Sequence, residues 1–251
     1  MKSVLKEYMR LDGGLKTKLE EEIAKEVALA IFVNGRQFST AMMSPQMKKE
    51  FVLGHLLSEG VIEGLEDVES LKIREDIAKV ITKNPIKVFA AKKVIVSGCG
   101  GSSGFLDESK LPKVDSKLKL DKKVLFEGIK KILTSDLHKR TGGTHTCAII
   151  EVSKTERSFI SEDIGRHNAL DKIIGHALLK KYHLPDTFVV CTGRISSEMV
   201  LKCSIAKIPI IASRGAVTSL AVEIANKTGL TVIGFVRGQR MNIYSNEQRI
   251  L

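Results

Sequence analysis

Three short segments in the C-terminal half of the chain combine glycine with arginine. They are residues 192–194, 214–215 and 237–240, and each directly follows an apolar run that predicts a strand. If the three strands are parallel, these segments meet at the carboxyl edge of one sheet, where open α/β sheets bind ligands. Guanidinium groups match phosphate oxygens, and glycine lets the backbone approach a ligand closely. Together the segments predict a phosphate or pyrophosphate site, although any one alone is better explained as a turn followed by a helix cap.

A fourth segment, residues 162–168, is dense in ionisable groups at a predicted junction of strand and helix. Glu162 and Asp163 are explained by helix electrostatics, because acidic side chains stabilise the positive N-terminus of a helix. The positive charges of Arg166 and His167 are unfavourable at this positive end of a helix unless a ligand or a salt-bridge network offsets them. Residues 141–145, TGGTH, form a further glycine-rich loop and are a weak signal. The candidate binding residues at this edge are therefore Arg166, His167, Gly193, Arg194, Ser196 and Arg214.

Cys99 lies between glycines in residues 97–105, SGCGGSSGF. Cys147, Cys191 and Cys203 lie in apolar runs, which predicts that they pack in the core. Cys99 has no apolar neighbour within two positions, so packing does not explain it. Flexible glycines would let a thiolate move between two partners, as a group-carrying cysteine requires.

Other kinds of catalytic site find no support in the sequence. No set of cysteines and histidines has the spacing of zinc ligands, so we expect no structural metal. The zinc deaminase pattern, the G-x-S-x-G pattern and the Walker A pattern are all absent.

The composition points to an anionic partner. The chain has 251 residues with 40 Lys and Arg against 29 Asp and Glu, a formal net charge of +11. Nucleic acid, a membrane surface and a phosphorylated cofactor all fit this charge. The absence of Trp and the low Tyr content argue against nucleic acid, because few side chains could stack on bases. No apolar run reaches the ~18 residues of a membrane helix, no secretory signal is visible, and the scattered cysteines predict a reducing cytoplasm.

The chain divides into three predicted parts. Residues 1–26 form a polar, partly mobile segment, residues 27–105 an α+β part that ends in the mobile cysteine loop, and residues 106–251 an α/β cofactor-binding part. The Lys-rich residues 106–123 are expected to be a linker or surface loop. Strands that alternate with helices after residue 141 predict a sheet with parallel crossovers.

The predicted elements follow from local patterns. In the α+β part we expect strands at 27–33, 36–41, 70–82 and 86–96, and a helix that is entered at Ser44-Pro45 and ends at Gly60. In the α/β part we expect strands at 145–152, 157–160, 187–191, 208–213 and 230–236, and helices at 124–133, 167–181, 197–206 and 217–228.

Several long motifs resemble one known family. Residues 162–175 (EDIGRHNALDKIIG), 192–202 (TGRISSEMVLK), 213–225 (SRGAVTSLAVEIA) and 234–245 (GFVRGQRMNIYS) are similar to the formate dehydrogenase accessory sulfurtransferases, the FdhD family. Upstream, residues 32–35, 51–62, 97–101 and 141–145 follow in the family's order. The resemblance covers about residues 27–245, most of the chain.

The resemblance implies a sulfurtransferase. Members accept sulfur from a cysteine desulfurase as a cysteine persulfide. They pass it to the molybdenum or tungsten bis(molybdopterin guanine dinucleotide) cofactor, which is inserted into the catalytic subunit of formate dehydrogenase. Cys99 matches the persulfide-carrying cysteine. The segment assigned to the guanine dinucleotide cofactor matches Phe235, Val236, Arg237, Gly238, Gln239 and Arg240.

The resemblance also implies a fold and an assembly. The fold is similar to a cytidine deaminase-like three-layer α/β sandwich that has lost its zinc site, with a smaller N-terminal α+β part, and homodimers are usual. We expect Arg194, Arg214, Arg237 and Arg240 to hold phosphates. Arg166 and His167 are expected either to lower the pKa of the carrier thiol or to orient the cofactor.

One residue departs from the family pattern. Many relatives carry C-G-x-C in the cysteine loop, and Ser102 occupies the second cysteine position in this chain. A persulfide on Cys99 therefore cannot be released by a disulfide with residue 102. The alternative function that this difference favours is a cofactor-binding chaperone that transfers no sulfur.

Overall fold

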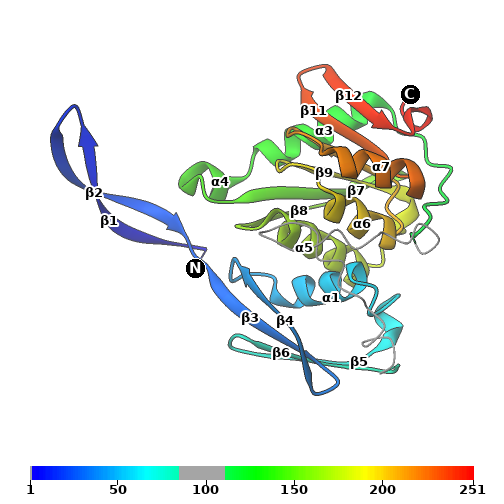
Figure 1. Ribbon diagram of the computed structural model, residues 1–251, viewed down its shortest axis with the longest axis horizontal. Helices are drawn as coiled ribbons and strands as arrows, with labels where there is room; N and C mark the ends of the chain where they lie inside the picture. Colours follow the sequence, from blue (N-terminus) through cyan, green and yellow to red (C-terminus); the bar gives the residue numbers. More distant parts are fainter. Residues whose placement is uncertain (1, 85–110) are drawn as a thin grey trace.

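The strands of the protein form three separate sheets, as seen in a computed structural model that describes residues 2–84 and 111–251 (Figure 1). The architecture is α/β with mixed sheets, which confirms the predicted class. The predicted strand at 86–96, Cys99 and Ser102 all lie outside the described residues.

The largest sheet has six strands in the order β12-β11-β10-β9-β7-β8. Strands β9, β10 and β11 are parallel, as the alternating strands and helices predict, while β7, β8 and β12 make the sheet mixed. Its strands are β7 (His145–Glu151), β8 (Lys154–Asp163), β9 (Thr187–Cys191), β10 (Ile210–Ser213), β11 (Thr231–Arg237) and β12 (Arg240–Ser245).

Helices cover both faces of this sheet because its side chains alternate between two apolar cores. Cys147 and Val189 belong to the core that contains α5, whereas Ala148 and Val190 belong to the core that contains α3. The helices are α3 (Lys122–Leu133), α4 (Asp136–Thr141), α5 (Arg166–Leu179), α6 (Ser197–Ile205) and α7 (Ser219–Thr228), with short 3-10 turns η3 (Leu184–Asp186) and η4 (Glu247–Arg249). Within the described residues, no helix has the length and apolar character needed to span a membrane.

The second sheet has four strands in the order β4-β3-β6-β5. Helix α1 packs on it and against α5, so α1 and α5 lie between the two large sheets (Figure 1). The elements are β3 (Val27–Val33), β4 (Arg36–Met43), α1 (Lys48–Ser58), η1 (Leu65–Asp67), β5 (Val68–Arg74) and β6 (Ile77–Thr82).

The third sheet is a hairpin of β1 (Ser3–Asp12) and β2 (Leu15–Ala24) that projects away from the rest of the molecule (Figure 1). Gly13 and Gly14 form its turn with positive φ angles of 52° and 89°. At its base, Glu22 pairs with Arg140 of α4 and accepts a hydrogen bond from Ser3. The sequence predicts only a polar segment here, because Lys and Glu on both strands obscure the alternation of a sheet.

Two elements of the α+β part differ between the prediction and the structure. The helix begins at Lys48 rather than at Ser44-Pro45, and Ser44 instead binds Asp163 and Ile164 through its backbone N–H and its hydroxyl. The predicted strand at 70–82 is two antiparallel strands, which a turn with a positive φ at Glu75 separates.

The Lys-rich stretch is not a free linker where the structure describes it. Leu111 and Val114 are buried, and Leu120 is fully buried in the core beneath α3. The backbone N–H groups of Val114 and Leu120 donate to Thr228 and Arg249. From residue 111 onward the chain is therefore a strap held against the α/β part, with its lysines outside.

Candidate functional site

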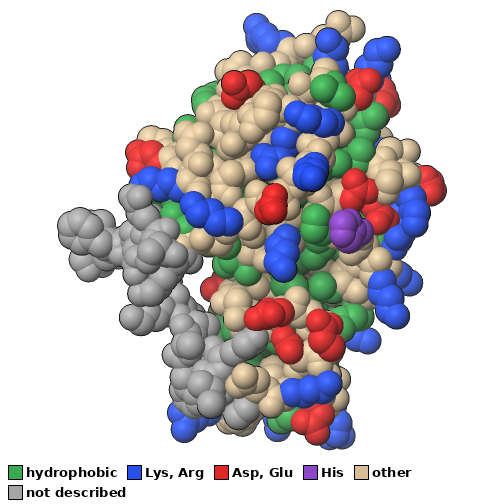
Figure 2. Space-filling view, turned by 90° about the vertical axis from the view of Figure 1, so that its right-hand side faces the viewer, with side chains coloured by type: hydrophobic (Ala, Val, Ile, Leu, Met, Phe, Trp, Pro, Cys, Tyr) green, Lys and Arg blue, Asp and Glu red, His purple; other side chains and the backbone are tan. Residues whose placement is uncertain are grey.

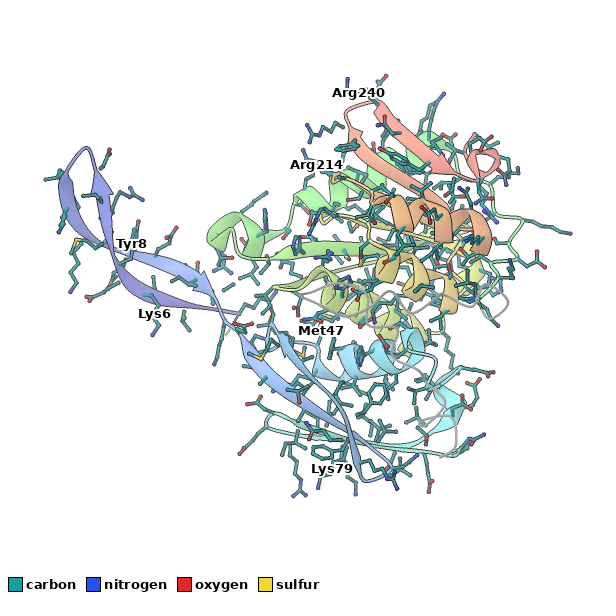
Figure 3. The ribbon with its side chains drawn as sticks, viewed as in Figure 1. Lys6, Tyr8, Met47, Lys79, Arg214 and Arg240 are labelled. Carbon is teal, nitrogen blue, oxygen red and sulfur yellow. The ribbon has the colours of Figure 1, made fainter. Side chains whose placement is uncertain are left out.

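The carboxyl edge of the six-stranded sheet brings the predicted loops together. Because β9, β10 and β11 are parallel, residues 192–194, 214–215 and 237–240 all emerge at one edge, as predicted. His145 begins β7 at the same edge, where it is paired in register with Asp163 at the end of β8. Figure 3 labels Arg214 and Arg240 on this side of the sheet.

Two glycines permit the close approach of these loops. A Cβ on Gly193 would lie 3.0 Å from Arg166 Cβ and 3.3 Å from His145 Nδ1. A Cβ on Gly215 would lie 3.2 Å from the backbone nitrogen of Arg194. Ser213 ties the loops together, since its hydroxyl donates to Gly193 O at 2.5 Å and accepts from Gly215 N at 2.9 Å. The glycines therefore bring arginine and histidine side chains of separate elements to one place.

The arginines at this edge have guanidinium groups without partners among the residues that the structure describes. Several arginines elsewhere are engaged: Arg157 pairs with Glu151 at 2.7 Å and Arg140 with Asp136 at 2.9 Å. Arg166 is partly buried, and its Nε is shielded from solvent without a hydrogen-bond partner. Among the residues that the structure describes, no ion pair or side-chain hydrogen bond engages the guanidinium groups of Arg166, Arg194, Arg214, Arg237 and Arg240.

His167 is compensated by a salt bridge. Its Nε2 lies 3.0 Å from Glu198 Oε2 and 3.3 Å from the hydroxyl of Ser196 at the start of α6. The sequence suggests that either a ligand or a salt-bridge network offsets the charge of His167, and the salt bridge is present. Within the described residues, no such carboxylate partner is seen for Arg166.

The acidic pair of the same segment has structural roles. Asp163 forms an ion pair of 2.5 Å with Lys172, and both side chains are fully buried. Asp163 also accepts from the N–H of Gly165 at 2.9 Å, which supports the start of α5. Glu162, in contrast, binds Ser135 and the N–H of His138 and so caps α4 rather than α5, which corrects the sequence-based explanation.

The segment assigned to the cofactor by family resemblance forms the β11–β12 turn. Arg237 and Arg240 face each other across this turn and are exposed, as are Gly238 and Gln239. Phe235 is 38% exposed in a strained conformation with φ 51°, where the register of the two strands shifts. The side chain of Val236 is fully buried in the α3 core, so only its backbone is available to a ligand.

A cavity of about 630 Å³ opens at the same edge on the α3 side of the sheet. Sequence reasoning missed most of it, because α4 has no strong local signal and the loop 141–145 was weak on its own. Its lining residues come from α3, α4 and three loops: Ile132, Leu133, Ser135, His138, Gly142, Gly143, Thr144, His145, Thr192 and Arg214.

The other three cysteines are core residues, as predicted. Cys147, Cys191 and Cys203 are fully buried, and Cys147 and Cys191 lie opposite each other on β7 and β9. Burial raises the pKa of the Cys203 thiol well above its ordinary value, so this thiol is inert. Cys99 lies outside the described residues. In the described part of the chain, no group of three or more His, Cys, Asp or Glu side chains could hold a metal ion.

Nearly the whole chain is similar to one protein family. The model of the FdhD/NarQ family matches residues 24–251. The sulfur carrier protein FdhD of Geobacillus kaustophilus is 36% identical over 255 residues, covering 95% of this chain and 94% of that protein. The protein of the same name from Methanothermobacter thermautotrophicus is 33% identical over 237 residues, covering 94% of each chain.

A solved structure has the same fold. It comes from Desulfotalea psychrophila, is provisionally described as a formate dehydrogenase accessory protein, and superposes with a TM-score of 0.82 at 27% identity over 99% of both chains. The resemblance of the sequence motifs is thereby confirmed, and the chain belongs to the FdhD/NarQ family.

Proposed function

We propose that the protein is a sulfur carrier that serves the maturation of formate dehydrogenase. The names of its relatives support this role. The structural observation that carries the proposal is the set of arginines at one sheet edge that have no partner among the described residues, because a sulfur carrier for a nucleotide-bearing cofactor must hold several phosphates.

The acceptor substrate that we propose is the molybdenum or tungsten bis(molybdopterin guanine dinucleotide). The residues present fit this group: the guanidinium of Arg166 has a shielded Nε without a partner, and Arg237 and Arg240 are exposed on the β11–β12 turn. Arg194 and Arg214 lie on the neighbouring loops. These arginines would hold the pyrophosphates, and the cofactor would supply the metal that receives the sulfur.

Cys99 is the proposed sulfur carrier. Its thiolate would attack the terminal sulfur of a persulfide on a cysteine desulfurase. The new S–S bond forms at Cys99, the S–S bond of the donor breaks, and the donor cysteine leaves as a thiolate. Ser102 cannot form a disulfide with Cys99, so we propose that Cys99 carries the sulfur without a resolving cysteine at residue 102.

The alternative is a chaperone that binds the same cofactor without sulfur transfer, and Ser102 is the residue that favours it. Both functions use the arginine edge, so the two are separated only by the need for Cys99. The formate dehydrogenase catalytic subunit is the proposed receiver of the cofactor in either case.

The assembly and its surroundings are also proposals. We expect a homodimer, for which the β1–β2 hairpin offers a surface, since Leu5, Met9 and Leu11 share one face and are 58–70% exposed.

On the face in Figure 2, basic and acidic side chains are interspersed, as on a solvated surface. Location in the cytoplasm, the division into 1–26, 27–105 and 106–251, and the cytidine deaminase-like comparison stay predictions.

Complementation tests the proposal. The chain and its Cys99→Ala variant would be expressed in a cell that lacks its own member of the family, and formate dehydrogenase activity would be measured. We expect the chain to restore activity and Cys99→Ala to restore almost none. Full restoration by Cys99→Ala at equal protein level would favour the chaperone.

A further inference from the structure

The cavity at the carboxyl edge has a distinct chemistry on the α3 side of the sheet. Thr192 and Arg214 continue the alternation in which Val190 and Ala212 face α3, so both belong to this side. Helix α3 supplies an apolar wall with Ile132, and the remaining lining is mostly polar. With a volume of about 630 Å³, the cavity has room for a phosphate group with part of a nucleoside.

The lining of this cavity holds basic but no acidic side chains. His138, His145 and Arg214 line it, and no Asp or Glu is among the described lining residues. The carboxylate that lies near its border, Glu162, is already engaged by Ser135 and by the N–H of His138. The electrostatic balance of the cavity therefore favours an anion.

Hydrogen-bond donors inside the cavity are positioned by other contacts. The Nδ1–H of His138 donates to Thr144 O at 2.5 Å, which fixes the imidazole and makes Nε2 of the neutral ring an acceptor. The Thr192 hydroxyl oxygen accepts from the N–H of Thr146 at 3.0 Å, so its own O–H is left to donate. Arg214 contributes a guanidinium that pairs with no described residue. Guanidinium and hydroxyl donors around glycine backbone suit the tetrahedral oxygens of phosphate.

His145 lies between this cavity and the arginines of the α5 side. The charged groups that face it are Arg166 and His167 from α5, His138 from α4 and Arg194 from the loop after β9. Asp163, its register partner on β8, is engaged by buried Lys172. Burial lowers the pKa of His145, and the positive charges around it lower it further, so the imidazole is neutral near pH 7.

We propose that His145 takes up one proton from solvent when a nucleotide phosphate occupies this cavity beside Arg214. A phosphate dianion beside the imidazole of His145 brings negative charge into surroundings that are otherwise positive. This charge favours the protonated imidazolium over the neutral ring. No covalent bond forms or breaks. The inference rests on the proposed function, whose acceptor carries guanine nucleotides, and it names the pocket and the protonation that hold one phosphate.

Calorimetry in two buffers with different ionisation enthalpies tests the proposal on the full chain at pH 7. The probes are inorganic phosphate, guanosine 5′-diphosphate and guanosine. The phosphate groups of the probes themselves titrate at about pH 6 to 7, so the readout is the difference in proton uptake between the parent and His145→Asn. For the diphosphate we expect the parent to take up roughly one proton more than His145→Asn. Guanosine should show no such difference. Arg214→Gln should weaken binding at least about tenfold, and His176→Asn, half-buried toward the C-terminal end of α5, should bind like the parent.

The arms of this experiment separate the sources of the phosphate. If inorganic phosphate binds with the same difference in uptake between the parent and His145→Asn, the pocket needs only the phosphate. If only the diphosphate binds, the pocket needs the nucleoside as well; both results support the proposal. Equal uptake by the parent, His145→Asn and His145→Gln, with both variants checked for native unfolding temperature, would overturn it, as would binding of guanosine with the same difference in uptake. Sulfur loading on Cys99 is measured separately, so failure of the pocket and failure of the carrier are distinguishable.

Discussion

Gly54 of α1 and Gly175 of α5 face each other where the two helices cross. A Cβ on Gly54 would lie 2.8 Å from Gly175 N and only 1.8 Å from the carbonyl oxygen of Asp171. A Cβ on Gly175 would lie 1.8 Å from the carbonyl oxygen of Glu50. The backbones of α1 and α5 thus touch, and this contact joins the four-stranded sheet to the six-stranded sheet that carries the candidate site.

Gly54→Ala should destabilise the protein, although alanine is the better helix former by about 1 kcal/mol. The added methyl group has no space unless the two helices move apart, so we expect a loss of about 3 kcal/mol or more. The measurement is the free energy of unfolding in urea. Gly143→Ala is the matched control, because the nearest atom to its Cβ lies at an ordinary 3.4 Å. Equal stability of the two variants would contradict the close contact.

A buried ion pair reinforces the same crossing and predicts a pH dependence. Lys202 Nζ lies 3.0 Å from Asp171 Oδ2, and His55 Nδ1 lies 3.1 Å from the same oxygen. Burial raises the pKa of Asp171, but Lys202 and His55 outweigh it and lower the pKa to about 2, below the ordinary 3.8. The ion pair therefore stabilises the fold above about pH 4, and this roughly 2 kcal/mol is lost as the pH falls toward 2.

Asp171→Asn tests this dependence. At pH 7 we expect a loss of about 3 kcal/mol, because Lys202 keeps its buried charge with only Glu59 as a carboxylate partner. The difference from the parent should shrink between pH 4 and pH 2, where the parent loses the same charge. Glu127→Gln, which breaks an exposed pair with Lys130, should change stability by at most a few tenths of a kcal/mol at any pH. A constant difference across this range would refute the linkage.

Local patterns in the sequence predict the central strands but not the contacts that complete the site. The bounds of β3 and β9 agree with the prediction because short apolar runs between turn residues specify buried strands. The meeting of the three glycine-arginine loops follows from parallel strands alone. Helix α4 was missed because its cap, Glu162, comes from a distant strand, and without α4 the cavity cannot be foreseen.

Residue type alone does not distinguish the roles of Arg166 and His167. Arg166 and His167 are neighbours with equal claims in the sequence, yet the structure pairs His167 with Glu198 and leaves Arg166 unpaired among the described residues. Whether each side chain is paired depends on its distance to Glu198 on α6, and the spacing of residues in the sequence does not predict that distance.

The buried cysteines predict a simple pattern of alkylation. Cys147, Cys191 and Cys203 are 0% exposed, so none of the three should react with a bulky maleimide in the native protein. All three should react in guanidinium chloride, and digestion with mass spectrometry identifies the labelled sites. Rapid native labelling of Cys191 would show that the strand end opens, and a second thiol would then be available at the site.

Arg237→Ala tests the assignment of the β11–β12 turn. If the exposed guanidinium holds a phosphate, the affinity for guanosine 5′-diphosphate should fall about tenfold or more. Arg74→Ala removes an exposed arginine on β5 of the other sheet and should leave the affinity unchanged. Equal binding by Arg237→Ala and the parent would remove this turn from the site.

The most direct test of the sulfur carrier is the intact mass of the protein after incubation with a cysteine desulfurase and L-cysteine. Our account predicts a gain of one sulfur atom that cyanide or a thiol reductant removes, and no gain in Cys99→Ser. A parent protein that gains no removable sulfur, or a Cys99→Ser variant that gains it equally, would contradict the account.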